Sequence, residues 1–166
     1  ASSFLGGVWE YLFGEIGLLG FKFLGATTFL VSALSVYFML REEFRDEALP
    51  YALLVGLICS YPFASIGVLT YDNLTSMFFI ISSALLYIGL KDDNKIYLVV
   101  AGFVLGWNFF VRLPNILGLM YLFSIVYFAY INKYSLAKLV SSTLCTIFGI
   151  VIGIVFVFIL MQYVGY

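Results

Sequence analysis

Long apolar runs separated by short polar breaks make up most of this sequence. A helix needs about 20 mostly apolar residues to cross the hydrocarbon core of a bilayer. The pattern predicts six such spans, of which the third and the fourth are short for the purpose. The predicted spans are 18–40, 48–69, 74–90, 96–111, 113–131 and 136–163.

Residues 1–17 differ from the six spans because apolar side chains there alternate with Glu10, Glu15 and four glycines. This mixture is typical of a segment that lies in the membrane interface. We therefore expect an external interfacial segment over 1–17, followed by a transmembrane helical domain over 18–166. Pro62 falls inside the second span, where it predicts a kink.

Composition places the chain in the class of all-α, polytopic membrane proteins. Hydrophobic residues make up 64% of it and charged residues only 10%, whereas soluble domains carry about 25% charged residues. The basic residues are scattered, so no stripe that could follow a nucleic-acid backbone is present. Nucleic acid is therefore excluded as an expected partner, and the lipid bilayer is the expected surroundings.

Counting Lys and Arg in alternate loops predicts the orientation of the spans, because cytoplasmic loops carry an excess of these residues. Six of the eight lie in the loops that follow the first, third and fifth spans. Arg112 lies on the other side, and Lys22 lies just inside the first span. We therefore expect both ends of the chain to be external, together with Asp72 and Arg112. The six loop residues are Arg41, Arg45, Lys91, Lys95, Lys133 and Lys138.

Asp72 and Arg112 are the strongly internal charges of the apolar region. A charged side chain in a span costs about 2.5 to 3.5 kcal/mol on insertion scales, so its presence indicates a function or a close partner. Two structural explanations stay open. The two residues could pair with one another, or Asp72 could accept N–H bonds at the start of the third span. Lys22 could simply extend its ammonium to the headgroups.

Familiar soluble-enzyme motifs are missing from the sequence. It has no histidine for a catalytic triad or a zinc site, and no glycine loop ahead of a lysine and a serine for phosphate binding. The segments Gly102–Gly106 and Gly149–Gly153 both fit the G-x-x-x-G spacing. This spacing clears one helix face so that another backbone can approach, and we interpret both segments as packing motifs.

A series of short motifs resembles the membrane domain of the C-type lipid-linked glycosyltransferases, the superfamily of protein O-mannosyltransferases and the lipid A aminoarabinose transferase. The resemblance covers residues 14–130 and is loose rather than a long signature. Its motifs are Gly14-Glu-Ile-Gly17, Lys22, Val36-Tyr-Phe-Met-Leu-Arg41, Leu69-Thr-Tyr-Asp72-Asn-Leu-Thr-Ser-Met-Phe-Phe79, Ala101-Gly-Phe-Val-Leu-Gly106 and Phe110-Val-Arg112-Leu-Pro-Asn115.

The resemblance implies transfer of a sugar from a polyprenyl-phosphate donor to a glycan, lipid or protein acceptor on the external face of a bacterial plasma (inner) membrane. It implies that Arg112, Lys22 and Asp72 bind the donor phosphate, and that Asp72 could instead hold a divalent metal ion. Tyr71, Asn73 and Asn115 are the implied neighbours. The family's catalytic base lies in an external loop upstream of this segment, so we expect no catalytic residue here and a longer protein overall.

Two other classes of function stay open. A transporter or lipid flippase also places charges near cavities in the membrane and uses short or broken helices. However, no inverted repeat is visible in the sequence, and Asp72 and Arg112 lie toward one face rather than at the midplane. A structural membrane subunit needs no internal charge, so the two residues count modestly against it.

Overall fold

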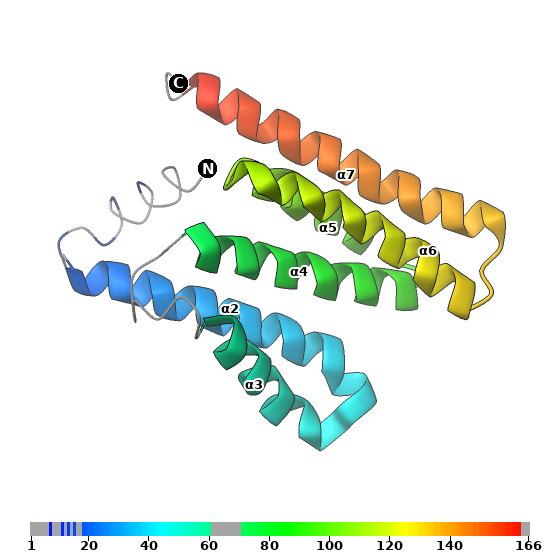
Figure 1. Cartoon of the computed structure of the whole chain (residues 1–166), viewed down its shortest axis with the longest axis horizontal. Helices are drawn as coiled ribbons and strands as arrows, with labels where there is room; N and C mark the ends of the chain where they lie inside the picture. Colours follow the sequence, from blue (N-terminus) through cyan, green and yellow to red (C-terminus); the bar gives the residue numbers. More distant parts are fainter. Residues whose placement is uncertain are drawn as a thin grey trace. The chain divides into compact units, whose positions relative to one another are not determined.

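The computed structural model describes residues 18–60 and 71–163, together with Gly7, Tyr11, Phe13 and Glu15. Within this part of the chain every regular element is a helix (Figure 1), as the composition predicts. The predictions for most of 1–17 and for a kink at Pro62 lie outside the described residues. The elements are α2 (Leu18–Phe44), the short 3₁₀ helix η2 (Arg45–Glu47), α3 (Ala48–Ser60), α4 (Tyr71–Lys91), α5 (Lys95–Asn108), the 3₁₀ helix η4 (Leu113–Met120), α6 (Tyr121–Ile131) and α7 (Leu136–Tyr163).

Most of the observed helices follow the predicted spans, and several bounds differ. Residues 61–69 of the second predicted span lie outside the described residues, and the fourth span ends at Asn108 instead of residue 111. The first helix continues through its charged end to Phe44 instead of stopping at residue 40. The third span is not short, because α4 has 21 residues. The fifth span begins as an eight-residue 3₁₀ helix, with Pro114 in its first turn, before it becomes α-helical at Tyr121. Runs of 3₁₀ helix longer than three or four residues are uncommon and often mark a functional or strained segment.

Four stretches of the described residues are long and apolar enough to cross a membrane: Lys22–Ile58, Asp72–Lys91, Pro114–Ile131 and Leu136–Tyr163. Helix α5 is apolar but shorter, with 14 residues. Large apolar side chains stay exposed on α3, α6 and α7, among them Ile58, Phe123 and Phe158. Extended exposed apolar surface of this kind fits contact with lipid tails rather than with water. The chain is therefore a helical protein that fits a membrane-embedded environment.

The chain divides into two compact units, residues 1–81 and 82–166, and α4 crosses the boundary between them. In the first unit, α2 and α3 pack against each other on either side of η2. Gly56 of α3 makes this contact close, because a Cβ there would lie 3.0 Å from the ring of Phe29 and 3.4 Å from the Cβ of Ala33. Arg45, with a φ of 43°, begins the turn between the two helices.

In the second unit, the main contact is between α5 and α7, and the two G-x-x-x-G segments form it. A Cβ built on Gly102 or Gly106 would overlap a backbone carbonyl of α7, and one built on Gly149 or Gly153 would overlap a carbonyl of α5. The backbones therefore touch directly, as expected for this motif. Each step of four residues along α5 meets a step of four in the same direction along α7, so the two helices run parallel. The carbonyls belong to Thr146, Ile150, Val99 and Phe103, respectively.

Candidate functional site

The candidate site is the turn that follows α5 and carries Arg112. Helix α5 ends at Asn108, and the backbone N–H of Val111 donates to the carbonyl of Asn108 at 3.1 Å. Arg112 then adopts an extended conformation, with φ −155° and ψ 132°, directly before η4. The N–H of Asn115 donates to the Arg112 carbonyl at 2.9 Å. The backbone on both sides of Arg112 is thus hydrogen-bonded, while its side chain is exposed.

Two buried carboxamides join the ends of this turn. Asn115 Nδ2 donates to the backbone carbonyl of Asn108 at 3.0 Å and to its side-chain Oδ1 at 2.9 Å. Asn108 is 0% exposed and Asn115 is 5% exposed. The contact also gives the Asn108 carbonyl, at the end of α5, a second donor beside the N–H of Val111.

The remaining amide group of Asn108 is not satisfied. Because Oδ1 faces Asn115, Nδ2 points away from that contact, and it has no hydrogen-bond partner among the described residues. A buried donor without an acceptor costs about 1 to 3 kcal/mol. The Asn108–Asn115 pair therefore defines the geometry of the turn at some cost in stability.

Arg112 and the lysines of the second unit lie at opposite ends of α5. A helix of 14 residues is about 21 Å long, compared with a hydrocarbon core of about 30 Å. If the loop at Lys95 lies at one membrane surface, α5 ends about 9 Å short of the opposite edge of the hydrocarbon core. The turn at Arg112 continues the chain from that level, and a long basic side chain can extend toward the headgroups.

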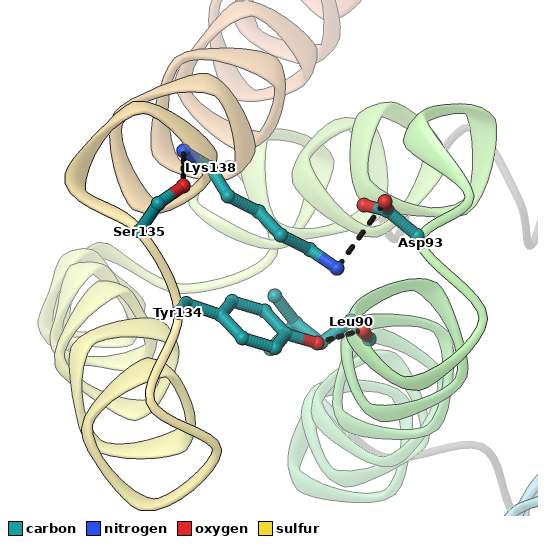
Figure 2. A network of polar contacts seen from close by, with 5 residues as sticks. All are labelled: Leu90, Asp93, Tyr134, Ser135 and Lys138. Atoms are coloured by element: carbon teal, nitrogen blue, oxygen red, sulfur yellow. Dashed lines mark hydrogen bonds and ion pairs between the residues drawn. The ribbon is translucent and has the colours of Figure 1, made fainter.

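Contacts between two loops form the lysine-rich end of the second unit (Figure 2). The Tyr134 hydroxyl donates to the carbonyl of Leu90, and Lys138 Nζ lies 3.2 Å from Asp93 Oδ2 and 4.0 Å from the centre of the Tyr134 ring. The backbone N–H of Lys138 donates to Ser135 Oγ at 3.3 Å. Asp93 is 60% exposed, and exposed ion pairs contribute about 0 to 1 kcal/mol. These contacts place the loops after α4 and α6 side by side.

The other predicted site residues belong to the first unit. Asp72 is half-buried in the first turn of α4, where a carboxylate is stabilised by the helix dipole, so its position has a structural explanation. Asn73 follows it and is also half-buried, and Tyr71 is the first residue of α4. Lys22 is exposed near the start of α2. The structure brings Arg112 and Asn115 together, and it adds Asn108 to them.

A metal ion at Asp72 stays a hypothesis from the resemblance. Within 18–60 and 71–163 no group of three or more His, Cys, Asp or Glu side chains is arranged to hold a metal ion.

Asn108 is the site residue that the sequence reasoning missed. A search for charged residues does not find it, because asparagine is neutral. A polar amide in the apolar run Gly106-Trp-Asn108-Phe-Phe is nevertheless unusual, as a charged side chain would be.

Comparison with protein-family models, with curated proteins and with solved structures finds no match to this chain.

Proposed function

We propose that this chain is the donor-binding membrane segment of an integral membrane glycosyltransferase that uses a polyprenyl-phosphate sugar. One observation carries the proposal: an exposed arginine on a hydrogen-bonded turn at the end of a short apolar helix. Transfer from such a donor leaves negative charge on phosphate oxygens. A guanidinium can bind two of these oxygens at once, and it acts more strongly where water is scarce.

The remaining residues of the proposed site take supporting roles. Lys22 contributes a second, less directional positive charge, and Asp72 orders the phosphate or holds a divalent metal ion. Tyr71, Asn73 and Asn115 are the further polar residues that the proposal assigns to donor binding. The base that activates the acceptor hydroxyl is supplied from upstream of this segment, so the proposal includes no catalytic base within it. The acceptor is a glycan, a lipid or a protein.

The proposal includes six membrane passes with both ends external, and this arrangement makes a prediction. Pro114 and Asp93 are both exposed and belong to the same unit. In a chain whose native Cys59 and Cys145 are replaced by serine, Pro114→Cys is expected to react with an impermeant thiol reagent added to intact cells. Asp93→Cys is expected to react only after the membrane is opened. The reverse pattern would overturn the orientation and the external site with it.

Binding of farnesyl phosphate, a soluble 15-carbon polyprenyl phosphate, tests the function directly. We expect the full-length protein in nanodiscs to bind it saturably, and to bind farnesol and inorganic phosphate at least about tenfold more weakly, because charge and chain both contribute. Equal binding of farnesol would indicate a nonspecific apolar site. Absence of farnesyl phosphate binding would favour a structural subunit, whereas binding followed by movement across the bilayer without sugar transfer would favour a flippase.

A further inference from the structure

The turn that carries Arg112 is closed by side chains rather than by backbone alone. A single amide group, Asn115 Nδ2, donates to both oxygens of Asn108, and the two asparagines are seven positions apart in the sequence. Both are buried, so water does not compete for these bonds, and hydrogen bonds in such surroundings are electrostatically stronger. Arg112 lies between the two anchored ends.

The pair leaves one buried polar group unsatisfied, because Asn108 Nδ2 has no acceptor among the described residues. A pair of apolar side chains in these two positions would leave no such donor. Replacing both partners of a buried hydrogen bond by apolar groups of the same shape is often nearly neutral, while removing one partner is costly. The asparagine pair carries the cost of one unsatisfied amide group. A need for the turn geometry that the pair imposes would explain why these two residues are present.

We infer that Asn108 and Asn115 are positioning residues that hold the Arg112 backbone so that its guanidinium meets the phosphate of the lipid donor. This inference rests on the proposed function for the ligand, but the mechanical part of it stands alone. The asparagine pair holds the turn, and the turn fixes the position of the Arg112 Cα and Cβ atoms. Because these atoms are already held in place, less conformational freedom is lost when the guanidinium binds a ligand.

Two variants separate positioning from plain stability. Asn115→Leu leaves Asn108 Oδ1 without its partner, while the Asn108 carbonyl keeps the N–H of Val111. The variant is expected to lower the thermal stability of the protein. The double variant Asn108→Leu with Asn115→Leu is expected to recover most of that stability, because no acceptor side chain stays buried and unpaired. Both variants lack the side-chain hydrogen bonds between positions 108 and 115 that close the turn. The full-length protein in nanodiscs is used throughout.

Two measurements are made on the wild-type, single and double variants. A nitroxide attached to Arg112→Cys, in the protein without its native cysteines, reports the motion of the turn. Farnesyl phosphate binding, measured with Arg112 intact, reports the presentation of the guanidinium. We expect an immobilised spin-label spectrum in the wild type and a mobile one in both variants. We expect farnesyl phosphate affinity to fall at least about tenfold in both variants.

The double variant decides the outcome. Restored stability with a mobile label and weak binding supports positioning. An immobilised label, or wild-type affinity in the stable double variant, overturns it. If the wild-type protein binds no farnesyl phosphate, the proposed function fails. The spin label still decides by itself whether the asparagine pair holds the turn.

Discussion

Replacing Gly149 by alanine is expected to disrupt the second unit of this protein. The new Cβ would overlap the carbonyl oxygen of Val99 and lie 3.0 Å from the backbone nitrogen of Phe103. Backbone atoms cannot turn aside as a side chain can, so α5 and α7 must separate along their whole contact. We expect a loss of about 3 kcal/mol in the free energy of unfolding, at the upper end of the cost of overpacking, measured by thermal or denaturant unfolding in detergent.

The matched control is Gly89→Ala in the same unit. The Cβ added there would lie 2.9 Å from Cδ2 of Leu98 and 3.1 Å from the Cβ of Tyr97, so its neighbours are side-chain atoms, and the closest is at the flexible end of a leucine. A smaller loss is expected, partly offset by the better helix propensity of alanine. Equal losses in the two variants would contradict the direct backbone contact.

Trp107 provides a local measurement of the same contact. Its ring lies 5.6 Å from the ring of Phe156 on α7 and 5.8 Å from that of Phe103, measured between ring centres. When α5 and α7 separate, the contact of Trp107 with Phe156 is lost, while Phe103 stays beside Trp107 on the same helix. In a Trp9→Phe background, the emission of Trp107 should therefore change in Gly149→Ala and stay near the wild-type spectrum in Gly89→Ala.

The helices could be predicted from the sequence because apolar length and charged breaks specify them locally. Helix α7 matches its predicted range, 136–163, at both ends. The pairing of the two glycine motifs could not be predicted. Each motif removes side chains from one helix face, but its sequence does not specify which helix packs against that face. The extension of α2 to Phe44 was missed because residues that end an apolar run, such as Glu42 and Glu43, are also good helix formers.

The candidate site was predictable to the extent that it depends on charge. Arg112 stands out in an apolar sequence, and Pro114 indicates a helix start beside it. The tie between Asn108 and Asn115 depends on the path of the turn, because the pair meets only when the chain reverses between α5 and η4. Sequence spacing alone does not fix that path. Amides in apolar runs are therefore candidates to test together with the charges.

Replacing Arg112 by alanine is expected to abolish sugar transfer by the full-length protein without affecting its insertion. The reason is that the guanidinium is the proposed partner of the charge that develops on the donor phosphate. Removal of a group with such a role lowers the rate by about 100-fold or more. Arg112→Lys keeps the charge but not the two-point contact, so a smaller loss of roughly tenfold is expected. Asp72→Asn is expected to reduce transfer sharply as well.

Incorporation of labelled sugar measures this loss in membranes that contain the full-length protein, with farnesyl phosphate added as a competitor of the donor. Lys133→Ala is the matched control, because it removes an exposed positive charge from the opposite end of the same unit. This variant should transfer sugar at the wild-type rate. Normal transfer by Arg112→Ala would exclude Arg112 from the donor site. Equal losses in Arg112→Ala and Lys133→Ala would show that net charge matters, and not a phosphate contact at the turn after α5.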